Sequence, residues 1–292
     1  MCEINLSQKN CKIITVANQK GGVGKTTICQ HLSYALAERG LRVLTVDFDP
    51  QMNLTLSMLP DGSNGAVLSI FDLLELLLAD KSLPDTTAYI AHTKGGDMIP
   101  GSKALGRLES ALLTEMGTES FLKSILAPLR VDYDYILIDT NRAASPLMVN
   151  ALTAADSVLI PINPEFYSTE GLSDLITTVL KNKRRLNPAV AFEGIVFSMC
   201  DTRTNLYRDI REDVEAAFQG EMRIFQTAIP RTVQVGEAVR RGMTVLEYAP
   251  DSKVSTAYRA FAEEVMSNGR QDNAGAPAYE LYVGAAGART GA

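Results

Sequence analysis

A glycine-rich segment at residues 20–27, Lys-Gly-Gly-Val-Gly-Lys-Thr-Thr, most constrains how this chain can fold. It follows an apolar run at Ile13–Ala17 that is typical of a buried strand, and it opens a helical pattern over Thr26–Arg39. Glycines in such a turn let backbone N–H groups converge on phosphate oxygens, and the helix N-terminus adds positive charge. A tight turn with chance glycines is the alternative, but Gly-Lys-Thr at this junction favours phosphate binding.

The residue types in this segment, called the phosphate loop below, indicate their roles. Lys25 is expected to reach the β- and γ-phosphates of a nucleotide, and the Thr26 hydroxyl to bind Mg²⁺. The generic pattern has glycine five residues before Gly24, where this chain has Gln19. A second lysine, Lys20, is not needed to hold the loop's own phosphates. The candidate nucleotide-binding residues are Lys20, Gly21, Gly22, Val23, Gly24, Lys25, Thr26 and Thr27.

The rest of the chain alternates strand-like and helix-like segments. We expect further strands at Arg42–Val46, Tyr135–Ile138, Val158–Ile162, Ile195–Met199 and Gln226–Ile229. We expect helices at Ser69–Ala79, Glu119–Leu129, Ser168–Lys183, Leu206–Phe218 and Ser255–Met266. Apolar strands separated by helices predict an α/β fold, with a doubly wound, mostly parallel sheet and helices on both faces.

The chain is expected to form one nucleotide-binding domain over residues 12–267, after a short extension at residues 1–11. Residues 60–117 are less regular, with turns at Gly62–Gly65 and Lys94–Gly96. The tail at residues 268–292 is rich in glycine and alanine, so we expect it to be disordered. Tyr279–Val283 within it is a candidate docking segment.

Composition excludes several classes of protein. The four cysteines form no Cys-x-x-Cys pair and do not cluster with the two histidines, which argues against a disulfide framework or a zinc site. The most apolar run, Leu73–Ala79, is too short to cross a bilayer, and the N-terminus has no signal-like segment. The net charge of −6 means that nucleic-acid binding would need a local basic patch. We expect a cytoplasmic protein.

Two acidic strand ends would complete a nucleotide site. The second strand runs into Asp47-Phe48-Asp49-Pro50-Gln51-Met52-Asn53, and the strand at Tyr135–Ile138 runs into Asp139. Carboxylates at the carboxyl ends of parallel strands lie beside the ligand crevice, where they can position water or act on Mg²⁺. A polar strand exit turned by Pro50 is the alternative for the first run.

The phosphate loop resembles the deviant Walker A motif of the ParA/MinD ATPases, and the run from Asp47 to Asn53 is similar to their switch I. The resemblance implies a nucleotide-sandwich homodimer in which Lys20 reaches the partner's ATP. It implies catalytic roles for Lys20, Lys25 and Asp49, with Asp49 orienting the attacking water. Asp139 matches the Walker B aspartate, and Ile229-Pro230-Arg231 matches a later segment in which Pro230 contacts the nucleotide. The implied cofactors are ATP and Mg²⁺, with Thr26, Asp139 and Asp49 as metal-site residues.

The resemblance covers about Lys12 to Met266, apart from the irregular stretch, and departs from the family after Asp139. The family follows that aspartate with Cys or Thr and then Pro-Pro or Pro-Ala. This chain has Thr140-Asn141-Arg142-Ala143. We hypothesise that the altered loop changes the rate of hydrolysis or its coupling to a partner.

The short N-terminal segment makes the chain similar to small ParA partition proteins, which bind DNA non-specifically as ATP dimers. Residues 181–241 hold eleven Lys and Arg against eight Asp and Glu. Arg208 and Arg211, three apart on an expected helix, would share a face. A solvated mixed-charge surface is the alternative. A second arginine usual in the family is Gln234 here, and two further arginines follow it. The candidate DNA-binding residues are Arg203, Arg208, Arg231, Arg240 and Arg241.

We therefore expect a weak ATPase that segregates or positions DNA cargo, stimulated by a ParB-like activator protein and nucleoid-associated when ATP-bound. A nucleotide-gated scaffold for a protein cargo remains a second reading. A MinD-like membrane-positioning ATPase would need a basic amphipathic C-terminal helix, which the Gly/Ala-rich tail does not resemble. A nitrogenase-reductase-like electron carrier would need cluster-ligating cysteines, and Cys200 has no suitable companion.

Overall fold

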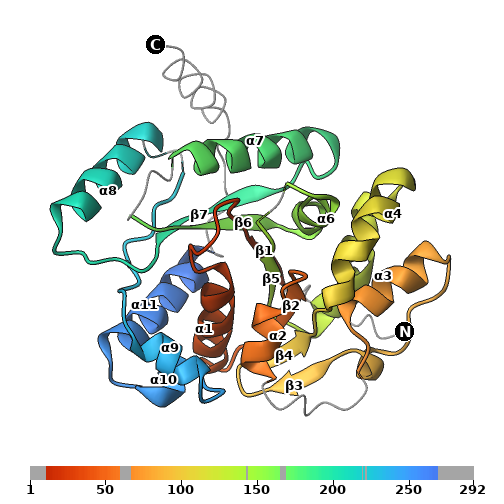
Figure 1. The fold of residues 1–292 in the computed structure, drawn as a ribbon, viewed down its shortest axis with the longest axis horizontal. Coiled ribbons are helices and arrows are strands. Elements are labelled where there is room, and N and C mark those ends of the chain that lie inside the picture. The colour runs from red at the N-terminus through yellow and green to blue at the C-terminus, as the bar shows by residue number, and fades with distance from the viewer. Residues whose placement is uncertain are drawn as a thin grey trace, which may run out of the picture.

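A seven-stranded sheet with the order β3-β4-β2-β5-β1-β6-β7 forms the centre of the molecule (Figure 1). The computed structural model describes residues 11–59, 67–142, 144–164, 169–218, 220 and 222–268. Six strands run parallel, and β3 pairs antiparallel with β4 at one edge. The strands are β1 (Lys12–Val16), β2 (Val43–Phe48), β3 (Ala91–Thr93), β4 (Gly96–Ile99), β5 (Tyr135–Thr140), β6 (Ser157–Ile162) and β7 (Ala191–Phe197).

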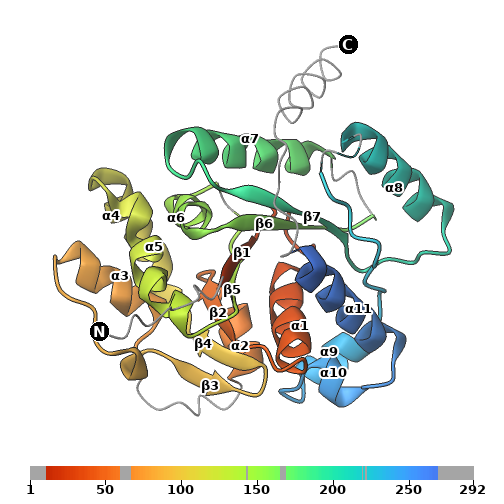
Figure 2. The same ribbon diagram turned by 180° about the vertical axis from the view of Figure 1, so that it is seen from behind.

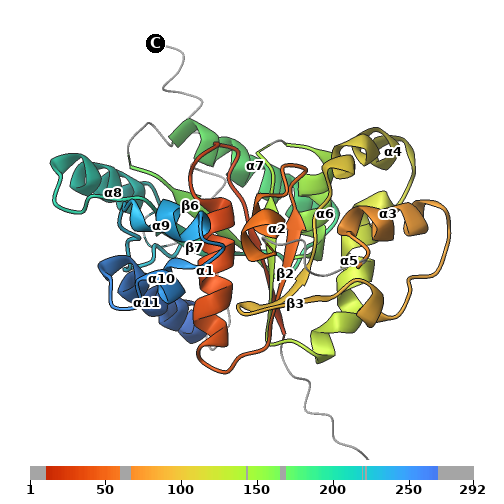
Figure 3. The same ribbon diagram turned by 60° about the horizontal axis from the view of Figure 1, so that its bottom comes forward.

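Helices cover both faces of the sheet, as the apolar strands predict (Figures 1 and 2). One face carries α1 (Lys25–Ala37), α10 (Val245–Tyr248) and α11 (Lys253–Asn268), which pack on the strands in one hydrophobic cluster. On the opposite face lie α3 (Ile70–Leu78), α4 (Glu109–Thr114), α5 (Phe121–Leu126), α6 (Pro146–Ala154), α7 (Thr169–Arg185) and α8 (Asn205–Phe218). The short helix α2 (Asn53–Met58) packs beside α1, and the short helix α9 (Gln234–Val239) packs beside α10 (Figure 3). The fold is the doubly wound α/β fold expected from the sequence.

Strand direction places the chemistry at one end of the sheet. The phosphate loop follows β1, Asp49 follows β2, and β5 carries Asp139 close to its carboxyl end. In the register, Asp139 is paired with Val16 on one side and with Asp47 on the other. The carboxyl ends of β1, β2 and β5, which are neighbours in the sheet, therefore bring these residues together.

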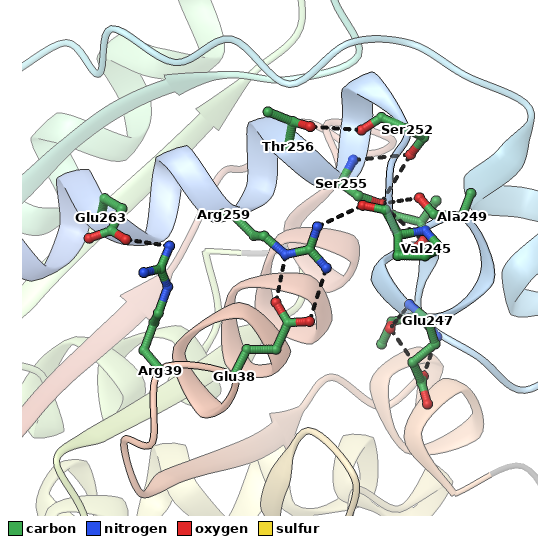
Figure 4. A network of polar contacts seen from close by, with 12 residues as sticks. Glu38, Arg39, Val245, Glu247, Ala249, Ser252, Ser255, Thr256, Arg259 and Glu263 are labelled. Atoms are coloured by element: carbon green, nitrogen blue, oxygen red, sulfur yellow. Dashed lines mark hydrogen bonds and ion pairs between the residues drawn. The ribbon is translucent and has the colours of Figure 1, made fainter.

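The nucleotide-side helix α1 is tied along its length to the C-terminal helices. His31 lies within α1, fully buried, where its Nδ1 lies 2.8 Å from the Thr27 carbonyl and its Nε2 accepts the Val245 N–H at 3.0 Å. At the far end, Nε and Nη2 of Arg259 donate to the Glu38 carboxylate at 2.8 and 3.0 Å (Figure 4). These bonds hold α10 and α11 against the helix that begins in the phosphate loop.

His31 gives the fold a specific pH dependence. Because Val245 donates to Nε2, the ring is neutral with its proton on Nδ1, and burial lowers the pKa of His31 from 6.5 to about 4. The unfolded chain then binds more protons than the folded chain between these values. The free energy of unfolding should fall by up to about 3 kcal/mol as the pH drops from 6.5 to 4. Urea titrations of the wild type and His31→Gln check this, because the variant should lose that part of the pH slope; an unchanged slope would contradict it.

The strand expected at Gln226–Ile229 is wrong. Two isolated bridges, Ile195 with Ile224 and Cys200 with Pro230, hold this segment along the edge of β7 instead. The backbone N–H groups of Gln226 and Thr227 donate to the Glu264 carboxylate of α11, each at 2.8 Å. The Glu264 side chain therefore accepts the N–H bonds that a neighbouring strand would otherwise accept.

Other differences are local. The irregular stretch contains the hairpin β3–β4, which turns at Lys94–Gly95 as the glycines indicate. The helix expected at Glu119–Leu129 is reduced to α5 with 3₁₀ turns on both sides, the second of which contains Pro128, which has no N–H to donate. The helix α6, which begins at Pro146, was not expected from the sequence. The expectations for residues 1–10, 62–65 and 268–292 lie outside the described residues or at their boundary.

No helix among the described residues is both long and apolar enough to span a bilayer.

Candidate nucleotide site

The phosphate loop has the backbone that its glycines predict. Gly22 and Gly24 adopt φ values of 73° and 85°, in the left-handed region that disfavours residues with a Cβ. Gly24 is the N-cap of α1, so the free N–H groups of the first helical turn face the loop. This arrangement forms a concave set of donors suited to phosphate oxygens.

Lys25 lies across the inside of the loop. Its ammonium donates to the Asn18 carbonyl at 3.0 Å and to the Lys20 carbonyl at 3.4 Å, and the residue is 8% exposed. Burial lowers the pKa of Lys25, while the charges of Asp139 and Asp49 act in the opposite direction. A phosphate entering the loop would give this buried cation a charged partner in place of two carbonyls.

Asp139 and Asp47 form a buried acidic pair between β5 and β2. Both side chains are fully buried, and neither carboxylate oxygen of Asp139 has a hydrogen-bond partner. Burial raises the pKa of Asp139 well above its usual range, and the charge of Asp47 adds to the effect. The Thr26 hydroxyl, which approaches the carboxylate without reaching hydrogen-bond geometry, opposes it. A buried carboxylate without a partner is costly unless a cation compensates it.

This geometry fits Mg²⁺. The Asp139 carboxylate and the nearby Thr26 hydroxyl offer hard oxygen atoms of the kind that magnesium prefers. The described part of the chain holds no group of three or more His, Cys, Asp or Glu side chains that could bind a metal. A magnesium ion at this site would therefore take its remaining ligands from nucleotide oxygens and water.

The segment after β2 is held in a defined conformation. Asp47 accepts from the Thr55 N–H at 2.7 Å and from its hydroxyl at 2.6 Å, and burial still raises the pKa of Asp47 to about 6. Asp49, half-buried, accepts the Gln51 N–H at 2.8 Å. Met52, the N-cap of α2, has φ 56°, a strained value for a residue with a side chain. The charge of Asp49 acts on both Lys25 and Asp139, so Asp49 lies within the site.

A second segment supports the phosphate loop from β7. The Ser198 hydroxyl donates to the Val23 carbonyl at 2.6 Å, and Met199, with φ 52°, lies beside Gly24. One residue further on, Cys200 forms a bridge with Pro230. Pro230 thus lies next to the segment that touches the loop.

Three of the candidate basic residues are gathered beside this segment. The Arg231 N–H donates to the Cys200 carbonyl at 3.0 Å, and the Arg208 guanidinium lies 3.5 Å from the Arg203 carbonyl. Arg203 is exposed and pairs with Asp201 through two bonds of 2.9 Å, and these bonds lower the pKa of Asp201 to about 2. An exposed pair of this kind contributes little to stability, so the guanidinium can exchange Asp201 for another anion.

Arg208 and Arg211 both lie on α8, as expected, but Arg211 is largely buried. The Arg211 side chain is 15% exposed, stacks over the Phe197 ring and donates to the Tyr207 hydroxyl at 3.1 Å. Arg240 and Arg241 are exposed at the end of α9, and Arg241 lies over the Tyr248 ring at 4.6 Å.

Comparison with known proteins places this site in a family. An AAA domain family, AAA_31, matches residues 11–192. The sporulation initiation inhibitor protein Soj of Bacillus subtilis is 38% identical over 258 residues, which cover 88% of this chain and 99% of Soj. The chromosome partitioning protein ParA of Caulobacter vibrioides is 36% identical over 271 residues, which cover 92% of this chain and 99% of that protein. This chain belongs to the ParA/MinD-type P-loop ATPases.

Solved structures agree with the assignment of this ParA/MinD-type ATPase. One, described as cobyrinic acid a,c-diamide synthase from Mycobacterium smegmatis with a bound ATP analogue and magnesium, is 32% identical with a TM-score of 0.75. The similarity covers 89% of this chain and 96% of that one. The cell division ATPase MinD of Pyrococcus furiosus, at 24% identity, has a TM-score of 0.67 over 88% and 98% of the two chains, and it supports the fold alone.

Some functional residues of this ParA/MinD-type ATPase were missed in the sequence. Asp47 was read as part of a motif, but its role in holding the start of α2 depends on Thr55, eight residues away. Asn18 orders the loop by accepting the Lys20 N–H at 2.9 Å. Ser198 carries no local signal, because its partner Val23 is 175 residues away in the chain.

Proposed function

We propose that this ATPase binds ATP with Mg²⁺, closes into a homodimer in which Lys20 reaches the partner's nucleotide, and binds DNA non-specifically. Asp49 would orient the attacking water, and hydrolysis stimulated by a ParB-like activator would separate the dimer and release the DNA. Repeated cycles would segregate or position a DNA cargo. The ATP-bound form would then be associated with the nucleoid.

The observation that carries this proposal is the link between the phosphate loop and the basic residues. Ser198 contacts the loop at Val23, and Cys200, two residues later, bonds to Arg231. A change in the loop on nucleotide binding would therefore reach the segments that hold Arg231 and Arg203. The charge arrangement agrees with non-specific binding, because phosphate neutralisation needs exposed cations and no base contacts.

A nucleotide-gated scaffold for a protein cargo is the second candidate. Two exposed apolar side chains, Leu206 at 53% and Val233 at 76%, lie close in sequence to the arginines. Exposed apolar side chains contact a protein surface better than they contact phosphates. In this case ATP binding and dimerisation would be unchanged, and DNA would not be bound in any nucleotide state.

Lys20→Ala tests the dimer. The variant should still bind an ATP analogue with near wild-type affinity, because Lys25 and the loop backbone remain, but it should stay monomeric with Mg²⁺ and ATP. Light scattering of wild-type protein under the same conditions should give about twice the monomer mass. Titration with a fluorescent ATP analogue measures the affinity. Equal loss of nucleotide affinity and dimerisation would contradict the role of Lys20 across the interface.

A further inference from the structure

The side chain of Arg142 lies directly over the phosphate loop. A β-carbon placed on Gly21 would come within 2.7 Å of both Cδ and Nη1 of Arg142 and within 3.3 Å of its Cζ. These are the three atoms nearest to that position. Arg142 therefore lies in the space left free by the missing side chain of Gly21, three residues after the buried Asp139 of β5.

The surroundings of Arg142 identify the ligand it would meet. Burial is the main cause that lowers the pKa of Lys25, and the charge of Arg142 acts in the same direction, so the two cations lie near the same region. Arg142 is exposed, and it has no hydrogen bond or ion pair with the residues that the structure describes. Lys25 and Arg142 repel each other, and the guanidinium of Arg142 lacks acceptors in the described part of the chain. An anion bound between the two cations would attract both.

A purely structural role does not explain this position. The loop after β5 is fastened by other contacts: the Asn141 amide donates to the Ser145 hydroxyl at 3.4 Å, and Thr140 donates to the Val16 carbonyl at 2.9 Å. Because Arg142 makes no bonds to the described residues, removing its side chain should change the stability of this loop little.

We propose that Arg142 is a further catalytic residue whose guanidinium contacts the γ-phosphate of ATP bound to the same subunit. This inference rests on the proposed ATP site. Arg142 follows the same strand end as Asp139 and lies over the phosphate loop at Gly21, so its guanidinium would meet the terminal phosphate. Water attacks the γ-phosphorus, the bond to the β,γ-bridging oxygen breaks, and ADP and phosphate leave with the water's protons. Arg142 would stabilise the negative charge on the transferring group, as an arginine finger supplied in cis does.

Arg142→Ala, Arg142→Lys and a control variant test the proposal. Arg39→Ala is the matched control, because it also removes one positive charge, from an exposed pair with Glu263 at the far end of α1 (Figure 4). Hydrolysis of γ-labelled ATP should fall by about 10²-fold in Arg142→Ala. Affinity for ADP should change by less than about twofold, while affinity for ADP with aluminium fluoride, a mimic of the transition state, should fall in parallel with turnover. Arg142→Lys should not recover full turnover, and Arg39→Ala should match the wild type.

Gly21→Ala provides a second route that leaves Arg142 in the sequence. The added methyl would push the Arg142 guanidinium aside. Gly21→Ala should therefore lower turnover much more when Arg142 is present than in the Arg142→Ala background, where there is no guanidinium to displace. Unchanged turnover and unchanged aluminium fluoride affinity in Arg142→Ala, with an active wild type, would overturn the catalytic role alone. Absence of nucleotide binding by the wild type would overturn the proposed function and the inference with it.

Discussion

Replacing Lys25 with alanine is expected to lower the rate of ATP hydrolysis by about 10²- to 10³-fold. Lys25 is 8% exposed, and its ammonium is held inside the phosphate loop by the Asn18 and Lys20 carbonyls. A preorganised donor in a water-poor site stabilises developing charge without reorganising during the reaction. Turnover of radiolabelled ATP, measured at saturating Mg²⁺, checks the result.

Lys81→Ala is the control for this variant. Lys81 is exposed beyond the end of α3, so its replacement removes the same charge outside the nucleotide site. Its turnover should equal that of the wild type. Turnover of Lys25→Ala within threefold of the wild type would mean that the buried ammonium does not contact the transferring phosphate.

Replacing Asp139 with asparagine is expected to stabilise the nucleotide-free protein and impair magnesium-dependent hydrolysis. The wild-type carboxylate is fully buried, lies beside Asp47 and has no hydrogen-bond partner. Asparagine has the same shape without the charge, so the free energy of unfolding should rise by on the order of 1–3 kcal/mol. Affinity for Mg²⁺ in the presence of ATP should fall by about 10- to 100-fold, because the carboxylate that orients the ion is lost.

The sign of the pH effect distinguishes this explanation from simple repacking. Because the pKa of Asp139 is raised in the folded protein, its contribution to stability is present at low pH and is lost as the pH rises. The gain from Asp139→Asn should therefore be larger at pH 8 than at pH 5. Urea unfolding at the two pH values measures it, and lower stability of the variant at both would show that the carboxylate is compensated in the free protein.

Local signals predicted the centre of the fold well. The apolar strands, the glycine-rich loop and the acidic strand ends are contiguous in sequence, so the positions of β1, α1, β2 and β5 followed from them. The juxtaposition of the phosphate loop, Asp49 and Asp139 then followed from the rule that parallel strands end at one edge. The family resemblance supplied the motif assignments that these patterns alone left open.

Contacts between distant segments could not be predicted in this way. Gln226 and Thr227 have the composition of a strand, but Glu264 takes their N–H groups from a helix 37 or 38 residues later. The spacing of Arg211 on its helix gives no sign that its guanidinium packs over the ring of Phe197, which lies in β7. The position of Arg142 over Gly21 depends on a loop conformation that spacing does not encode.

Co-sedimentation of the protein with DNA tests the central claim most directly. The wild type is measured with ATP, with ADP and without nucleotide over a salt series, beside Arg203→Ala and Arg231→Ala, with Arg39→Ala as the control. We predict binding that requires ATP, weakens steeply with salt because phosphate contacts release counterions, and falls in both arginine variants but not in the control. Absence of DNA binding by the wild type in every nucleotide state would contradict the claim and favour the protein scaffold.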